Sequence, residues 1–217
     1  MAEYPVTLRG PVVVIGAGGH AHPVVEMLDA LGVEIAGLAD RSLDVPTVLG
    51  HRVIVKIDDL ASLSKRGIND VVVAVGNNEV RVRLADYARS VGLGLPTIVH
   101  PTALVSPSAS LREGVQIMAR AFVGPKAVLE RLVLVNTAAI VEHECYVGSG
   151  SHIAPGSVLC GAVRVGMKCL VGAGSTVVPG CTIGDRTIVG AGGVVADNLG
   201  ADLVVGGLPA RPLVRRP

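Results

Sequence analysis

The 217-residue sequence predicts two domains in tandem, a parallel α/β domain followed by a parallel β-helix built from hexapeptides. Three observations support this architecture. Apolar strands alternate with helical segments in the first half, an aliphatic residue recurs at every sixth position in the second half, and 28 glycines accompany an aromatic content of only 2%. A core with so few aromatic side chains must be built from small and β-branched residues, which is typical of a repetitive fold.

The six-residue period runs through residues 105–195 without interruption. Its sixteen aliphatic members are Val105, Leu111, Ile117, Val123, Leu129, Val135, Val141, Val147, Ile153, Leu159, Val165, Val171, Val177, Ile183, Val189 and Val195. An α-helix repeats every 3.6 residues and an exposed strand every 2, so a period of six requires a chain that turns a corner once per hexapeptide. We expect a triangular prism of about five coils, about 18 residues per coil, with the aliphatic residues pointing inward.

Two further positions of the hexapeptide are restricted. The residue two places before the aliphatic one is mostly small, as at Ala121, Ala139 and Cys145, and should fit a cramped corner. A glycine often follows the aliphatic residue, and these glycines predict tight turns that need a positive φ or little bulk. They are Gly124, Gly148, Gly166, Gly172, Gly184 and Gly190.

The alternation of strands and helices in the first half predicts a Rossmann-like parallel sheet with helices packed on it. The expected strands are residues 11–15, 33–39, 70–75 and 95–99, and the expected helices lie near 24–31, 60–63 (capped by Asp58 or Asp59) and 79–91. In such sheets ligands bind beyond the carboxyl ends of the strands, where glycines let the backbone approach a phosphate. The candidate nucleotide-binding residues are therefore Gly16, Gly18, Gly19, His20, Asp40, Gly76 and Asn77. The alternatives are a glycine turn without a ligand, an Asp40 that only ends a strand in solvent, and a His20 that only begins a helix.

Composition excludes several classes of partner. The formal net charge is +1 and the basic residues are scattered, which gives no electrostatic footprint for nucleic acid or an anionic membrane. No apolar run is long enough to span a bilayer, and the N-terminus lacks the features of a secretory signal, so we expect a cytoplasmic protein. The four cysteines form no CxxC pair and no zinc spacing with histidine, and we expect reduced, buried thiols and no metal.

The order of the domains, the GAGGH turn at residues 16–20 and the segment NTAAIVEHECYVGSGSHIAPG at residues 136–156 resemble one family over residues 11–212. It comprises the sialic-acid O-acetyltransferases and the sugar N-acetyltransferases of bacillosamine and perosamine synthesis. The resemblance implies a left-handed β-helix, a homotrimer, and acetyl-CoA bound between neighbouring prisms. The expected parts are a tail (1–10), a nucleotide-sugar-binding domain (11–99), an acyltransferase β-helix (100–205) and an exit segment (206–217).

Acetyl transfer to an amine needs a base, and histidine suits this role because imidazole exchanges protons near neutral pH. The resemblance implies His143 as the general base and Glu144 as the carboxylate that orients it. It also implies that Asn136 lies near the acceptor sugar and His152 near the acetyl group. The implied CoA-binding residues are Gly172, Ala173, Gly190 and Ala191. The alternative for the Glu-His-Glu cluster is a solvated corner of a repeat protein.

The leading hypothesis is an N-acetyltransferase that acts on a 4-amino-4,6-dideoxy sugar attached to UDP or GDP. Family members that bind uridine nucleotides often carry two acidic residues where this chain has Asp40-Arg41, so the base stays open. The alternatives are O-acetylation of a sialic acid or related sugar, and a non-enzymatic trimeric scaffold. Arg211, Arg215 or Arg216 could meet CoA phosphates or belong to a solvated tail.

Overall fold

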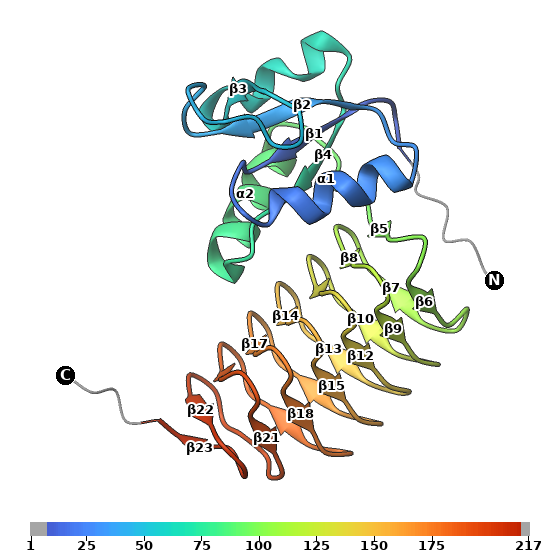
Figure 1. The fold of residues 1–217 in the computed structure, drawn as a ribbon, viewed down its shortest axis with the longest axis vertical. Coiled ribbons are helices and arrows are strands. Elements are labelled where there is room, and N and C mark those ends of the chain that lie inside the picture. Colours follow the sequence, from blue (N-terminus) through green and yellow to red (C-terminus); the bar gives the residue numbers. More distant parts are fainter. Residues whose placement is uncertain (1–7, 214–217) are drawn as a thin grey trace. The chain divides into compact units, whose positions relative to one another are not determined.

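The structure, a computed structural model, describes residues 8–213 and forms two compact units that divide between Pro101 and Thr102. Figure 1 shows the longer helices in the first unit and the stack of short strands in the second. Across residues 8–213, no helix has both the length and the apolar character needed to cross a membrane. Residues 1–7 of the expected tail lie outside the described part. Arg9, within the same expected tail, forms an ion pair with the buried Asp70, with 2.6 Å between Nη2 and Oδ1.

The first unit contains a four-stranded parallel sheet in the order β3-β2-β1-β4. Its strands are β1 (Val12–Ile15), β2 (Ile35–Asp40), β3 (Val53–Lys56) and β4 (Asp70–Val73). The α-helices α1 (Ala21–Ala30) and α2 (Asn78–Ser90) follow β1 and β4. Strand β1 is fully buried, as expected for a central strand of a sheet that is covered on both faces.

Two predictions for this unit are wrong. Residues 95–99 do not supply the fourth strand of this sheet, because only β5 (Ile98–Val99) is extended there and it belongs to another sheet; the fourth strand is β3, which pairs with β2. The segment after β3 forms two 3₁₀ helices, η1 (Ile57–Ser62) and η2 (Ser64–Arg66), in place of a helix capped by an aspartate. Asp58 and Asp59 lie inside the first turn of η1, and neither side chain caps it.

The second unit is a parallel β-helix of two-residue strands. They are β6 (Leu104–Val105), β7 (Ser110–Leu111), β8 (Gln116–Ile117), β9 (Phe122–Val123), β10 (Val128–Leu129), β11 (Leu134–Val135), β12 (Ile140–Val141), β13 (Tyr146–Val147), β14 (His152–Ile153), β15 (Val158–Leu159), β16 (Arg164–Val165), β17 (Leu170–Val171), β18 (Thr176–Val177), β19 (Thr182–Ile183), β20 (Ile188–Val189) and β21 (Val194–Val195). The predicted aliphatic residue is the second member of every strand, and all sixteen are buried except Leu111, which is half-buried in the first coil. The predicted inward orientation is therefore confirmed.

Strands inside the stack pair with the strands 18 residues before and after them, as Val128 does with Ser110 and Tyr146. Three faces result, which run β7-β10-β13-β16-β19, β8-β11-β14-β17-β20 and β6-β9-β12-β15-β18-β21. Figure 1 shows the last of these faces as a ladder of parallel arrows. Two strands finish the unit: β22 (Val204–Gly206) extends the second face in parallel, and β23 (Arg211–Pro212) pairs with it antiparallel.

Small side chains at the corners satisfy carbonyl groups of the following coil. The hydroxyl of Ser157 donates to the carbonyl oxygen of Gly172 at 2.8 Å, and that of Ser175 donates to Gly190 at 2.9 Å. The thiol of Cys145 likewise donates to the carbonyl of Cys160 at 3.1 Å. The small residues therefore fit the corner and also pair buried backbone acceptors.

Five of the six glycines that follow the aliphatic residues, all except Gly190, are required by close approach of backbone atoms in the next coil. A Cβ on Gly148 would lie 2.6 Å from the carbonyl carbon and oxygen of Gly166, in the next coil. The positive φ angles occur two residues later in each turn and are often taken by other residues, such as Lys126 (59°) and Glu144 (59°). Little bulk is thus the correct explanation for these glycines, and the positive-φ explanation is wrong.

We expect Gly148→Ala to lower the free energy of unfolding by about 1–3 kcal/mol, because backbone atoms cannot give way to the added methyl group. Chemical denaturation would measure the change. Gly200→Ala is the matched control, since a Cβ there would meet only a Leu203 methyl carbon at 4.0 Å. Equal stability of the two variants would contradict the explanation.

Candidate functional site

His143 and Glu144 form an exposed imidazole–carboxylate pair in the turn between β12 and β13. Nδ1 of His143 lies 3.2 Å from Oε2 of Glu144, and the two side chains are 57% and 55% exposed. The backbone of the pair is bound on both sides. The N–H of Glu144 donates to the carbonyl of Pro125 in the preceding coil, and the carbonyl of His143 accepts from the N–H of Ala162 in the following one. A solvent-facing imidazole is thus presented from a rigid turn.

This geometry selects one tautomer of the imidazole. A carboxylate can only accept hydrogen bonds, so Nδ1 carries the proton and donates a hydrogen bond to Glu144. Nε2 then has a free lone pair that can accept a proton from a substrate. The carboxylate also stabilises the imidazolium that results, which is the arrangement that a general base requires.

Asn136 and His152 are brought together on the face that contains β11 and β14. The side-chain nitrogen Nδ2 of Asn136 lies 3.0 Å from Nε2 of His152, and Oδ1 of Asn136 accepts from the backbone N–H of Thr137 at 2.7 Å. Strand pairing sets the contact, because Leu134 lies opposite His152. Two polar side chains that lie sixteen residues apart in the sequence are therefore in hydrogen-bonding contact.

Apart from His152, which lies within β14, the predicted residues of the β-helix fall at two different corners. Asn136 and the four expected CoA-binding residues all follow strands of the face that contains β11, and they stack at one corner, the Asn136 corner. The four are Gly172, Ala173, Gly190 and Ala191. His143 and Glu144 follow a strand of the next face and lie at another corner, the His143 corner.

In the first unit, Asp40 holds the glycine turn. Its Oδ2 accepts from the N–H of Ala17 at 2.7 Å, and its Oδ1 accepts from the N–H of Arg41 at 2.6 Å. Gly16 has a φ of 105°, which explains a glycine there. A Cβ on Gly18 or Gly19 would meet no atom within 4 Å. The carboxylate of Asp40 therefore holds the backbone of the turn, and the space beside Gly18 and Gly19 is open.

His20 and Asn77 occupy helix N-caps. His20 precedes α1 and makes no capping bond with its side chain, whereas the side chain of Asn77 accepts from the N–H of Val80 at 3.0 Å. The neighbouring Gly76 is open, since a Cβ there would also meet nothing within 4 Å. The glycine turn follows the carboxyl end of β1, and the loop that contains Gly76 follows the carboxyl end of β4.

Arg81, which is not among the predicted site residues, holds the loop at residues 75–78 through its side chain. Its buried guanidinium donates to the carbonyl oxygens of Val75 and Gly76 and to the side chain of Asn78 at 2.9–3.1 Å. Burial lowers the pKa of Arg81 to about 10, so the group stays charged at neutral pH. The available signal was an arginine on the helical stripe that otherwise carries Leu84, Ala85 and Ala88.

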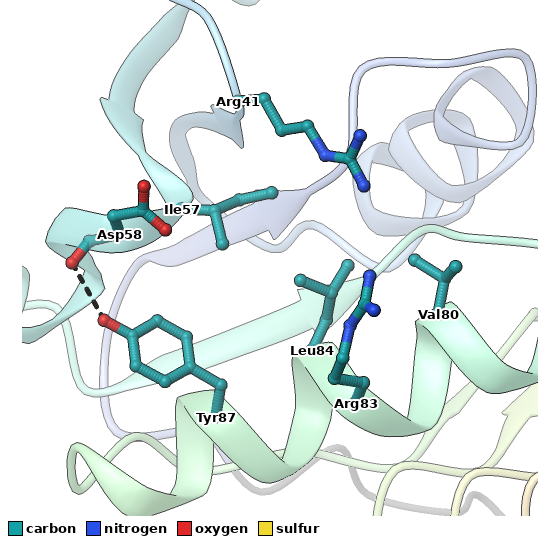
Figure 2. Close-up of a pocket in the computed structure, with 7 residues that line it drawn as sticks. All are labelled: Arg41, Ile57, Asp58, Val80, Arg83, Leu84 and Tyr87. Carbon is teal, nitrogen blue, oxygen red and sulfur yellow. Dashed lines mark hydrogen bonds between the residues drawn. The ribbon is translucent and has the colours of Figure 1, made fainter.

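A cavity of about 620 Å³ lies between the end of β2 and helix α2. Figure 2 shows Arg41 and Arg83 extending into it from opposite sides. The other lining residues are Ile57, Asp58, Val80, Leu84 and Tyr87. The hydroxyl of Tyr87 donates to the carbonyl of Asp58 at 2.8 Å, which ties η1 to α2 along one side. The cavity therefore combines an apolar floor with two cationic donors.

All the cysteines of the chain lie in the β-helix. All four are free thiols, and Cys145, Cys169 and Cys181 are buried. Within residues 8–213 there is no cluster of three or more histidine, cysteine or acidic side chains that could hold a metal ion. Burial is the main cause that raises the pKa of Cys145, to about 11.

We expect Cys145 to resist alkylation at pH 8, because only about a thousandth of a thiol with that pKa is the reactive thiolate. The half-buried Cys160 should react first. Peptide mass spectrometry after iodoacetamide treatment of the native protein would measure both sites. Faster labelling of Cys145 than of Cys160 would contradict the packing role.

Of the C-terminal arginines, Arg211 forms an exposed ion pair with Asp197, with 3.2 Å between Nη1 and Oδ2. Arg215 and Arg216 lie outside the described residues.

Comparison with known proteins covers both units. A family model for the PglD N-terminal domain matches residues 11–88, and a model for the bacterial transferase hexapeptide (six repeats) matches residues 162–197. UDP-N-acetylbacillosamine N-acetyltransferase from Bacillus subtilis (strain 168) is 34% identical over 114 residues. That alignment spans 50% of this chain and 51% of the relative, so the chain matches about half the length of this curated relative.

Two solved structures match along nearly the whole chain. A histidine-to-alanine variant of GDP-perosamine N-acetyltransferase from Caulobacter crescentus, in complex with CoA and GDP-perosamine, is 40% identical with a TM-score of 0.92 and covers 94% of this chain and 97% of its own. The acetyltransferase domain of PglB from Neisseria gonorrhoeae FA1090, in complex with acetyl coenzyme A, is 38% identical with a TM-score of 0.88 and covers 95% and 100%. These matches confirm the predicted fold, a parallel-sheet domain followed by a left-handed β-helix. The chain therefore belongs to the family of hexapeptide-repeat sugar N-acetyltransferases that carry a PglD N-terminal domain.

Proposed function

We propose that this chain transfers an acetyl group from acetyl-CoA to the amino group of a nucleotide-linked amino sugar. The observation that carries the proposal is the exposed pair of His143 and Glu144, held 3.2 Å apart on a rigid corner of the β-helix. The proposal is supported by the likeness, over 94% of the chain, to an enzyme in complex with CoA and GDP-perosamine.

In the proposed reaction the amine nitrogen attacks the thioester carbonyl directly. Nε2 of His143 takes a proton from that nitrogen as the C–N bond forms, while Glu144 stabilises the imidazolium. The tetrahedral intermediate then collapses, the C–S bond breaks, and the proton passes to the departing thiolate of CoA. The enzyme ends the cycle unchanged, and no acetyl-enzyme forms.

The nucleotide of the acceptor is assigned to the first unit. The open glycine turn at Gly18 and Gly19, together with Gly76, leaves room for a diphosphate to approach backbone N–H groups. The adjoining cavity suits the nucleoside, because its apolar floor can pack on a base while Arg41 and Arg83 donate to base or phosphate oxygens. In this proposal Asp40, His20 and Asn77 shape the site, and Asp40 acts by holding the turn.

Acetyl-CoA is assigned to the Asn136 corner, with Asn136 and His152 near the reacting groups. Because the His143 corner is a different edge of the same prism, we propose that three copies associate so that a His143 corner of one copy faces the Asn136 corner of the next. A homotrimer would complete three such sites. We place the reaction in the cytoplasm, where acetyl-CoA is available.

The test is an assay of CoA release from acetyl-CoA with two acceptors, the GDP-linked and the UDP-linked 4-amino-4,6-dideoxyhexoses. We expect turnover with at least one of them and an acetylated amine by mass spectrometry. A sialic acid and the matching 4-hydroxy sugar nucleotide are the controls for O-acetylation. Absence of turnover with every amino sugar, in protein that binds CoA, would overturn the proposal.

A further inference from the structure

Gly161 stands at a position of the hexapeptide where no other glycine occurs. The position lies two residues after the recurrent aliphatic residue, and it is occupied sixteen times between Pro107 and Asp197. The other fifteen occupants are proline, alanine, serine, threonine, methionine, arginine, histidine and acidic residues. The repeat itself therefore tolerates almost any side chain here, and a glycine at residue 161 needs a local reason.

The backbone does not supply that reason. Gly161 does not adopt a positive φ, and the left-handed position of this turn falls on the next residue, Ala162, with a φ of 58°. Close approach of another backbone segment is also not the cause. The three atoms nearest to a Cβ on Gly161 all belong to one side chain, whereas those nearest to a Cβ on Gly124 or Gly148 all belong to the backbone.

The side chain in question is that of His143, one coil earlier. A Cβ on Gly161 would lie 2.5 Å from Nε2, 2.6 Å from Cε1 and 3.3 Å from Cδ2 of the imidazole. The ring thus occupies the space that any other residue at position 161 would fill. The edge that meets Gly161 carries Nε2, which is the nitrogen left with a lone pair when Nδ1 donates to Glu144.

The backbone around Gly161 is fixed. The carbonyl of Cys160 accepts the thiol proton of Cys145, and the N–H of Ala162 donates to the carbonyl of His143 at 2.9 Å. These bonds hold the turn against the coil that carries the imidazole. The backbone of Gly161 is therefore held in place and cannot shift to accommodate both a side chain at residue 161 and the His143 ring.

We propose that Gly161 is a positioning residue for the base of the acetyl transfer, an inference that builds on the proposed function. The imidazole is located at two points, by Glu144 at Nδ1 and by the bare backbone of Gly161 beside Nε2. A methyl group at residue 161 pushes the ring out of this place. Because the ring is more than half exposed, it can swing into solvent, so the fold survives and the effect falls on turnover.

The test is Gly161→Ala. We expect kcat to fall roughly tenfold or more, because small displacements of a catalytic group cost large factors in rate. The Kd for CoA and the KM for the sugar nucleotide should stay close to the wild-type values, and so should the melting temperature. Gly200→Ala, which adds a methyl group that meets only a Leu203 methyl carbon at 4.0 Å, should change none of these quantities.

A double variant tests whether Gly161→Ala lowers turnover by displacing the ring of His143. Gly161→Ala should reduce the residual activity of His143→Ala no further, because the ring that it displaces is already gone. An equal fold-loss in both backgrounds would overturn the proposal, as would wild-type kcat in the single variant. If Gly161→Ala instead destabilises the fold, the loss of melting temperature should disappear in the His143→Ala background, and its persistence would also overturn the proposal.

Failure of this inference is distinguishable from failure of the proposed function. An active Gly161→Ala enzyme beside an inactive His143→Ala enzyme removes only the role of Gly161. A wild-type protein that turns over no amino-sugar nucleotide removes the function itself.

Discussion

His143→Asn should lower kcat for acetyl transfer by about 10²–10⁴-fold, the range that a positioned general base contributes. The amide of asparagine is smaller than the ring but can place a nitrogen near the position of Nδ1 and so still meet Glu144, and it has no basic lone pair to accept a proton. The KM for acetyl-CoA should change little, since the expected CoA-binding residues lie at the Asn136 corner. Steady-state kinetics with both substrates varied would measure the split between kcat and KM.

A second histidine provides the control. His51 lies in the first unit at an isolated bridge with Val48 and belongs to neither proposed substrate site, so His51→Asn should leave kcat unchanged. Turnover by His143→Asn at the wild-type rate would remove His143 as the base. A comparable loss in both variants would indicate a general effect on folding.

Leu129→Ala should lower the free energy of unfolding by about 2–5 kcal/mol, the range for removing a large aliphatic side chain from a packed core. Leu129 is fully buried in the prism and lies between Leu111 and Val147 on the coils at either side. Loss of its side chain leaves a cavity that neighbouring coils cannot close, because their backbones are tied by the strand ladders. Chemical denaturation monitored by circular dichroism would measure the change.

Leu104→Ala is the matched control, since it deletes the same atoms from the outward position of β6. Leu104 is 53% exposed in the chain, so its replacement should cost well under half as much. Similar losses for the two leucines would contradict the inward and outward assignment of the two-residue strands.

The β-helix could be predicted closely because one rule repeats. Every hexapeptide must bury one aliphatic residue and turn one corner, and each repetition tests the same expectation. The first unit offered no such redundancy. Strand β3 has only four residues, and a short apolar run of this length does not distinguish a strand from part of a helix. The sequence instead predicts the fourth strand of the sheet at the apolar segment 95–99, which is extended only at Ile98–Val99.

The candidate site was predictable by residue type but less so by role. The chemistry of acetyl transfer favours a histidine, and the family resemblance selects His143 with Glu144, which the structure brings within 3.2 Å of each other. Asp40 is a candidate ligand contact, and in the structure its carboxylate accepts from the N–H of Ala17 and of Arg41. Sequence alone does not tell whether a carboxylate at a strand end faces outward or back to its own loop. Gly161 becomes informative only when the chain is folded into coils that place it beneath His143.

The spacing of 18 residues between paired strands also limits how this domain can change in length. If every corner kept its place in the register, deleting one residue would turn every later strand over, so that aliphatic side chains face solvent and outward side chains enter the prism. Removing or duplicating a whole coil preserves the alternation throughout. Variation in the number of coils is therefore accessible to evolution and to protein engineering in whole steps, whereas single-residue insertions are confined to the turns that can loop out.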